Sequence, residues 1–322
     1  DRKKAEYTRS GREVLDLGIG DPDLGAPPEL VEALRKSLDI HEYHRYPSDR
    51  GLGRLIEAIG GWARKHYGVS VGSDEILVTV GSKEAIGHLP LAVVNPGQAV
   101  LVPDPGYPVY NSSAVFAGAE PVRMPLLKEN GFFPEFGEIR PSVAKNARMM
   151  YLNYPNNPTS ATATKEQFIQ AMEFSAQNAL VMINDAAYSE ISYGERQEAL
   201  FPLAGKAGIE YIELFSFSKT FSITGWRVGF AIGSPQVISA LARLKANVDS
   251  GVFSAIQAAA AVALETDYEG ITGRIMETYR ARRDTLAASL EKGGFSFTAP
   301  AATFYFWIEV PGGGSSIEYC GK

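Results

Sequence analysis

Short apolar runs alternate with helical stretches along the middle of the chain, and this alternation is the strongest constraint on its fold. The runs cover residues 76–80, 99–102, 149–152, 180–183, 211–215 and 228–232. Stretches with helical character lie between them, near residues 83–94, 165–177 and 235–248. Continuous apolar runs are typical of strands buried on both faces, and strands that alternate with helices form a mostly parallel sheet. The sequence therefore predicts an α/β fold in which helices flank such a sheet.

Polar residues follow four of these predicted strands. Gly81 and Ser82 follow the first, residues 153–159 the third, Asp185 the fourth and Lys219 the fifth. In such sheets, ligands bind in the crevice at the carboxyl ends of the strands. Four polar clusters at equivalent strand ends therefore predict one binding site at this edge of the sheet.

Lys219 lies among small hydroxyl residues, shortly after an apolar run, and Arg227 follows eight positions later. Burying a lysine is costly unless its amine is neutral or covalently used, and burial lowers its pKa, as a Schiff-base lysine requires. The hydroxyls and Arg227 suit a phosphate group, which arginine can bind through two hydrogen bonds. An aldehyde-binding lysine beside a phosphate site indicates pyridoxal 5'-phosphate (PLP). The alternative is an ordinary solvent-exposed lysine.

Two further candidates suit the same cofactor. Asp185 either caps a following helix or keeps a pyridine nitrogen protonated through a charge-assisted hydrogen bond. Tyr188, three residues later, would share its face of a helical turn. Asn157 stands between prolines in a rigid turn, where it either belongs to a plain polar loop or donates to a phenolate oxygen.

The segment of Gly81, Ser82 and Lys83 lies at a strand-to-helix junction. It is either a routine turn with a serine cap or an anion site, where backbone N–H groups and the helix dipole favour phosphate. Tyr107 follows another strand and either belongs to the core or stacks on a planar ring.

Composition narrows the class of protein. A formal net charge of −6 without a dense Lys/Arg block gives no reason to expect nucleic acid. The single cysteine, Cys320, excludes an internal disulfide and favours a reducing compartment. We find no apolar run long enough for a membrane helix and no signal-peptide core, so a cytoplasmic location is expected. The four histidines (His41, His44, His66 and His88) show no metal-ligand spacing, so we expect no metal.

From about Leu17 onward, the chain resembles the PLP-dependent aminotransferases of fold type I (class I/II, the aspartate aminotransferase superfamily). Within that group it is similar to the bacterial LL-diaminopimelate aminotransferases. The stretches that carry this closer resemblance are residues 18–23 (GIGDPD), 81–84 (GSKE), 88–92 (HLPLA), 247–253 (NVDSGVF) and 302–305 (ATFY).

The resemblance implies a role for each candidate. Lys219 would bind the cofactor covalently and Asp185 its pyridine nitrogen. Asn157 and Tyr188 would contact the phenolic oxygen, and Tyr107 would stack on the ring. The phosphate would be bound by Ser82, Lys83 (through its backbone), Ser216 and Arg227.

The resemblance also implies an obligate homodimer with shared sites. Tyr46 would cross the interface to the partner's phosphate, Gly20 would lie near the substrate carboxylate, and Asp49 would contact the distal ammonium group of diaminopimelate across the interface. Two departures stand out: Ser160 occupies a position where glycine is usual, and the family continues well beyond Lys322. The continuation carries the arginine that binds the substrate carboxylate, so we expect this sequence to be incomplete.

The resemblance places the domains as well. Residues 1–39 and 283–322 would form a small α+β domain, and residues 40–282 the large PLP-binding domain with a seven-stranded sheet. In the small domain the patterns predict strands at 14–17, 295–297 and 303–309 and a helix from near Pro28. A long helix is predicted over 268–292, before the last two of these strands.

The activity implied is amino-group exchange between LL-diaminopimelate/tetrahydrodipicolinate and glutamate/2-oxoglutarate, in lysine biosynthesis. The alternatives are an aminotransferase for alanine, aspartate or aromatic amino acids, a PLP β-lyase, and a non-catalytic PLP-binding domain.

Overall fold

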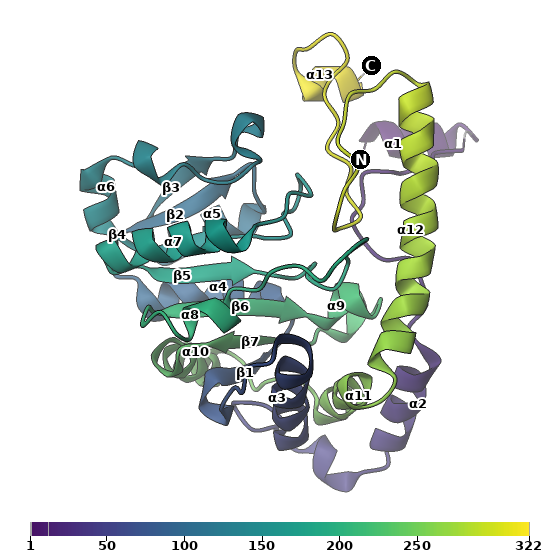
Figure 1. Ribbon diagram of the computed structural model, residues 1–322. Coiled ribbons are helices and arrows are strands. Elements are labelled where there is room, and N and C mark those ends of the chain that lie inside the picture. Colours follow the sequence, from purple (N-terminus) through teal and green to yellow (C-terminus); the bar gives the residue numbers. More distant parts are fainter. Residues whose placement is uncertain (1, 12, 322) are drawn as a thin grey trace.

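The computed structural model describes residues 2–11 and 13–321, built around a seven-stranded sheet (Figure 1). The strands are β1 (Ile76–Thr79), β2 (Ala99–Asp104), β3 (Glu120–Pro125), β4 (Ala147–Leu152), β5 (Val181–Asp185), β6 (Tyr211–Ser216) and β7 (Gly229–Gly233). The α-helices are α1 (Arg2–Arg9), α2 (Pro28–Ser37), α3 (Gly53–Tyr67), α4 (Ser82–Val93), α5 (Pro108–Phe116), α6 (Pro141–Asn146), α7 (Lys165–Asn178), α8 (Phe201–Ala204), α9 (Phe217–Thr220), α10 (Pro235–Val248), α11 (Ser254–Glu265), α12 (Tyr268–Lys292) and α13 (Ser316–Gly321). Short 3₁₀ turns cover His41–His44, Ser73–Glu75, Lys128–Asn130, Phe136–Glu138 and Thr224–Trp226.

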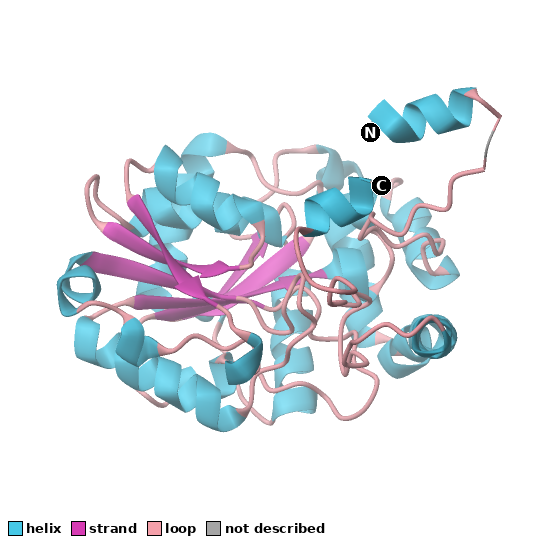
Figure 2. Cartoon of the chain, turned by 90° about the horizontal axis from the view of Figure 1, so that it is seen from above, coloured by secondary structure: helices cyan, strands magenta, loops and turns pink. Residues whose placement is uncertain are grey.

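The sheet is mostly parallel, as predicted. Its strand order is β1-β7-β6-β5-β4-β2-β3, and β7 alone among these strands runs antiparallel to its neighbours, β1 and β6. Helices cover both faces (Figure 2). The carboxyl ends of the six other strands therefore lie at one edge, and the beginning of β7 lies there too.

Each face of the sheet has its own hydrophobic core, because successive strand residues point to opposite sides. In β1, Ile76 and Val78 pack in the larger core, whereas Leu77 packs in the smaller one. Helices α3 and α7 contribute to the larger core, and α4, α5 and α10 to the smaller. With both faces covered, the strands have the continuous apolar runs seen in the sequence.

Strand β3 was not predicted from the sequence. Most of its residues are exposed or only partly buried, and the strand contains Pro121 and Pro125. Proline cannot donate to a strand ladder and is tolerated at a sheet edge, which is where β3 lies. Edge strands lack the apolar run that identifies buried ones.

The strands predicted near the two ends of the chain do not form. Residues 13–17 have no assigned secondary structure, and Leu15 and Leu17 are 81% and 86% exposed. The segments 295–297 and 303–309 share only an isolated bridge between Phe297 and Ile308. Alternating patterns predicted the strands at 295–297 and 303–309, but a strand also needs a neighbour to pair with along its length.

The helices predicted from Pro28 and over 268–292 are present as α2 and α12. After α12 the chain returns toward the sheet (yellow in Figure 1), where Thr303 N donates to Ile191 O at 2.9 Å. Helix α12 runs unbroken across residue 283, and the division into residues 40–282 and a domain of both termini stays a prediction. Among the described residues, no helix has the length and apolar character needed to cross a bilayer.

Candidate functional site

Four adjacent strands bring the candidate residues to one edge of the sheet. Gly229, at the start of β7, pairs with Thr79 at the end of β1 and with Ser216 at the end of β6. Asp185 ends β5 and pairs with Leu214 of β6. The turn after β1, the Lys219 helix, Arg227 and Asp185 therefore meet at this edge, as the strand-end pattern predicted.

Lys219 lies in the short helix α9, directly after β6. Its Nζ donates to Gly20 O at 3.0 Å and lies 3.9 Å from Asp21 Oδ1, and its side chain is 18% exposed. Burial lowers the pKa of the Lys219 amine, Asp21 opposes this shift, and Arg227 adds to it. A partly buried amine with a lowered pKa is the form of lysine that acts as a nucleophile or base.

Asp185 is buried, with 5% of the residue exposed. Its Oδ2 accepts from Tyr110 Oη at 2.8 Å, and its Oδ1 accepts from Ala187 N at 3.3 Å. Burial raises the pKa of this carboxyl to about 6, although the Tyr110 hydrogen bond lowers it. Residues 187–190 form a turn, so Asp185 does not cap a helix. Both donors are neutral, and a cationic N–H would stabilise the carboxylate further.

Tyr188 is buried, and its hydroxyl lies 2.6 Å from that of Tyr305. Burial raises the pKa of Tyr188 far above its usual value, so the phenol stays protonated and can donate. The Tyr305 ring packs against Gly20, where a Cβ would lie 2.8 Å from Tyr305 Cε1. Only glycine fits this approach, which brings Tyr305 beside the Gly20 carbonyl that Lys219 contacts.

The turn after β1 faces Arg227. Gly81 has a φ of 72°, and a Cβ there would lie 2.6 Å from Arg227 Nη2. The Arg227 guanidinium is exposed and donates to Thr224 O at 2.9 Å and Val80 O at 3.4 Å. Ser216 Oγ accepts from Ser218 N at 3.2 Å, so its own proton remains for another acceptor.

Helix α4 begins at Ser82, with Gly81 as its N-cap and no side-chain cap. The serine-cap alternative is therefore wrong for Ser82. The N–H groups of the first turn, Lys83 included, need acceptors from outside the helix. Together with Arg227 and Ser216, they can bind an anion such as phosphate.

Tyr107 and Asn157 flank the same edge. Tyr107 is half-buried, with its ring centroid 5.8 Å from that of Tyr110 and 5.9 Å from Lys83 Nζ. Asn157 N donates to Asn153 Oδ1 at 2.8 Å, and Asn153 Nδ2 donates to Asp185 O at 2.7 Å. Asn153 thus ties the Asn157 loop to the end of β5.

Tyr46 and Asp49 differ from the other candidates. Tyr46 is 88% exposed, and Asp49 is exposed as well. Within the described residues, neither makes a side-chain hydrogen bond or ion pair with the rest of the site.

Sequence reasoning missed Tyr110 and Tyr305, although each touches a candidate directly. Tyr110 lies three residues after Tyr107, so their shared face at the start of α5 was a usable signal. Tyr305 belongs to the stretch ATFY, which supported the resemblance but carried no assigned role.

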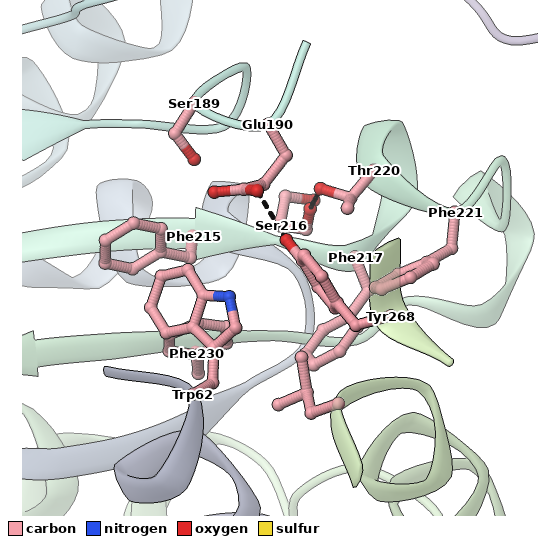
Figure 3. A pocket seen from close by; sticks show the side chains of 11 residues that line it. Trp62, Ser189, Glu190, Phe215, Ser216, Phe217, Thr220, Phe221, Phe230 and Tyr268 are labelled. Atoms are coloured by element: carbon pink, nitrogen blue, oxygen red, sulfur yellow. Dashed lines mark hydrogen bonds between the residues drawn. The ribbon is translucent and has the colours of Figure 1, made fainter. Parts of the chain in front are cut away.

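A small cavity lies behind the Lys219 turn (Figure 3), with a water-accessible volume of only about 20 Å³. Its wall is mainly aromatic and includes Trp62, Phe215 and Tyr268, whose hydroxyl donates to Glu190 Oε2 at 2.5 Å. Lys219 does not line it. The cavity is too small for a cofactor, and its aromatic wall supports the base of α9.

The residues present fit PLP by their chemistry. Lys219 offers a partly desolvated amine for an aldehyde, and Asp185 a buried carboxylate whose two donors are neutral. Tyr188 offers a phenol as hydrogen-bond donor. At Gly81, the space that a Cβ would fill faces the Arg227 guanidinium, where a phosphate can be bound.

Comparison with known proteins gives a family match and close relatives. Residues 12–313 match the family model described as aminotransferase class I and II. The chain is 41% identical to an LL-diaminopimelate aminotransferase from Syntrophobacter fumaroxidans, over 99% of this chain and 82% of the relative. It is 42% identical to the LL-diaminopimelate aminotransferase of Aquifex aeolicus, over 100% of this chain and 83% of the relative.

Solved structures agree with this match. An apo structure of BacF from Bacillus subtilis superposes with a TM-score of 0.93 at 36% identity, covering 99% of this chain and 81% of that one. Aspartate aminotransferase from Thermus thermophilus, solved with maleate, gives a TM-score of 0.90 at 28% identity, covering 99% of this chain and 84% of the other.

Proposed function

Since this chain belongs to the class I and II aminotransferases and is a PLP-dependent transaminase of fold type I, we propose that its substrates are LL-diaminopimelate/tetrahydrodipicolinate and glutamate/2-oxoglutarate. The observation that carries the proposal is the identity of 41% and 42% to two relatives with that printed activity, over almost the whole chain. The reaction belongs to lysine biosynthesis.

Lys219 is the proposed covalent and proton-transfer residue. When bound, PLP supplies an electron sink for the carbanion that forms at the substrate Cα. The neutral Lys219 Nζ accepts the Cα proton and later returns a proton to the substrate. Its lowered pKa supports this role, because a protonated amine cannot act as a base.

Asp185 is the proposed partner of the pyridine nitrogen. Its carboxylate would hold the ring N–H protonated, and the Tyr110 hydroxyl at 2.8 Å keeps the carboxylate oriented. A charge-assisted bond of this kind contributes about 1.5–3 kcal/mol. Asn157 and Tyr188 are the proposed donors to the phenolic oxygen, and Tyr107 the proposed stacking ring.

The phosphate is proposed to bind between the turn after β1 and the start of β7. Its ligands would be Ser82, the backbone N–H of Lys83, Ser216 and Arg227. The guanidinium approaches the turn closely: a Cβ at Gly81 would lie only 2.6 Å from Arg227 Nη2. This close approach supports the proposed location.

We further propose a cytoplasmic homodimer with shared sites. The 88% exposure of Tyr46 supports a role across an interface, because a tyrosine so exposed makes few contacts within its own chain. Tyr46 would bind the partner's phosphate, Gly20 the substrate carboxylate, and Asp49 the distal ammonium group of diaminopimelate. Unchanged diaminopimelate turnover in Asp49→Ala would exclude that last role.

A spectral titration of the full-length protein tests the substrate assignment. We expect LL-diaminopimelate and glutamate to convert the cofactor to its amine form at low concentrations, with alanine and aspartate much weaker. Preference for alanine, aspartate or an aromatic amino acid would reassign the substrate. Release of ammonia and pyruvate without an oxo-acid acceptor would indicate a β-lyase, and no conversion by any amino acid a non-catalytic domain.

A further inference from the structure

Two buried residues with left-handed backbone conformations face each other beside the candidate site. Ser160 has a φ of 63° and Thr303 a φ of 66°. This conformation is uncommon for any residue with a Cβ and a true outlier for a β-branched one, so the surrounding structure must hold both. Their hydroxyl oxygens lie 2.8 Å apart, although 143 positions separate them in the sequence.

The direction of each hydrogen bond in this contact can be assigned. Ser160 Oγ donates to Tyr305 O at 2.6 Å, which uses its only proton. Thr303 Oγ1 must therefore donate to Ser160 Oγ, and it accepts in turn from Tyr305 N at 3.1 Å. Each proton is used once, so the three residues form a complete network. We call it the Ser160 link.

The Ser160 link joins the loop that carries Asn157 to residues 301–305. The opposite side of residues 301–305 is held by backbone bonds, Thr303 N to Ile191 O and Tyr193 N to Ala301 O, each 2.9 Å long. Within the described residues, every hydrogen bond from loop 153–161 to residues 301–305 involves Ser160 Oγ. Removing this hydroxyl would free one side of the segment.

Tyr305 extends the Ser160 link into the site. Its hydroxyl lies 2.6 Å from that of Tyr188, and its ring covers Gly20, whose carbonyl accepts from Lys219. A shift of the Tyr305 backbone would therefore move the ring that contacts both Gly20 and Tyr188.

We propose that Ser160 is a positioning residue for transamination: its hydroxyl holds Tyr305 against Gly20 and Tyr188, and thereby shapes the pocket that binds the amino acid. The inference rests on the proposed roles of Gly20 and Tyr188. Ser160 acts through Tyr305, since its hydroxyl contacts Thr303 and Tyr305.

Substitution by glycine separates this role from a purely structural one. Ser160→Gly deletes the hydroxyl but also relieves the left-handed backbone, which offsets part of the stability lost with the two hydrogen bonds. Ala179→Gly is the matched control. Ala179 also has a positive φ, 53°, and it is exposed. It lies between the end of α7 and the start of β5, whereas Asp185 lies at the other end of β5.

The first readout is amide hydrogen exchange in the apoprotein, followed by mass spectrometry of peptides that cover residues 301–306. We expect faster exchange in Ser160→Gly than in the wild type and Ala179→Gly. The second readout is steady-state kinetics of the holoenzyme. We expect KM for the amino acid donor to rise roughly five- to tenfold in Ser160→Gly, about the effect of one net hydrogen bond, with a smaller change in kcat.

A second pair of variants tests the Ser160 link from its other side. Thr303→Val removes the hydroxyl and should also raise KM, whereas Thr303→Ser keeps it and should leave KM near the wild-type value. A KM for Ser160→Gly within about twofold of the wild type would overturn the proposal, whatever the exchange data show. Absence of transamination by the wild type would instead contradict the proposed function, while exchange in the apoprotein would still report on the link.

Discussion

The Asp185 carboxylate at the end of β5 lies 2.8 Å from the hydroxyl of Tyr110 in α5, and both side chains are buried. Burial raises the pKa of Asp185 from 3.8 to about 6. Between these two values the folded apoprotein binds more protons than the unfolded chain does. This carboxyl therefore makes folding less favourable as the pH rises from about 4 to 6, by an amount on the order of 3 kcal/mol.

Asp185→Asn should remove that pH dependence. We expect the variant apoprotein to have a higher free energy of unfolding than the wild type at pH values above about 6, together with much weaker PLP binding. Urea unfolding at several pH values measures the free energy of unfolding. Asp39→Asn, at an exposed residue, is the control. An unaltered pH slope in Asp185→Asn would show that this carboxyl does not titrate as described.

Lys219→Ala should lose the covalent link to PLP and lower kcat by at least about a hundredfold, the usual size of a lost general acid or base. Borohydride reduction followed by peptide mapping should label residue 219 in the wild type and give no label there in the variant. The exposed Lys206→Ala serves as control. A wild-type label on another lysine would contradict the assignment.

Gly81→Ala should weaken phosphate binding, because the new methyl group would lie 2.6 Å from Arg227 Nη2 and displace the guanidinium. We expect PLP affinity to fall about tenfold, as for one lost charge-assisted hydrogen bond, with little change in the affinity for pyridoxal, which lacks the phosphate. Gly97→Ala is the matched control, since Gly97 also has a positive φ, 83°, but open space around its Cβ. Equal losses for PLP and pyridoxal would argue against a phosphate site here.

Lys245→Met should destabilise the fold by about 3–5 kcal/mol, because it leaves two carboxylates without their cation. Lys245 is buried, and its Nζ lies 2.6 Å from Asp249 Oδ1 and 3.2 Å from Glu84 Oε2. Chemical denaturation measures the loss. Lys65→Met, which removes an ion pair with Glu269 at 2.7 Å on the surface, should cost at most about 1 kcal/mol. Similar losses in both variants would contradict the prediction.

Much of the fold could be predicted because it depends on local patterns. The apolar runs identified six of the seven strands, and Lys219 and Asp185 were identified by their place after such runs. The edge strand β3 lacked this signal, since low burial left it without an apolar run. The strands expected at 295–297 and 303–309 had the right alternation but only an isolated bridge between them.

Tertiary contacts alone decided the rest. The sequence by itself determined the α/β class, the position of the site and the residue types suited to PLP, because buried strands and their carboxyl ends leave patterns within a few residues. It could not show that Tyr110 contacts Asp185, 75 positions away, or that Ser160 contacts Thr303. Such pairs depend on how distant segments pack, and a hydrogen bond between them leaves no periodic trace in either segment.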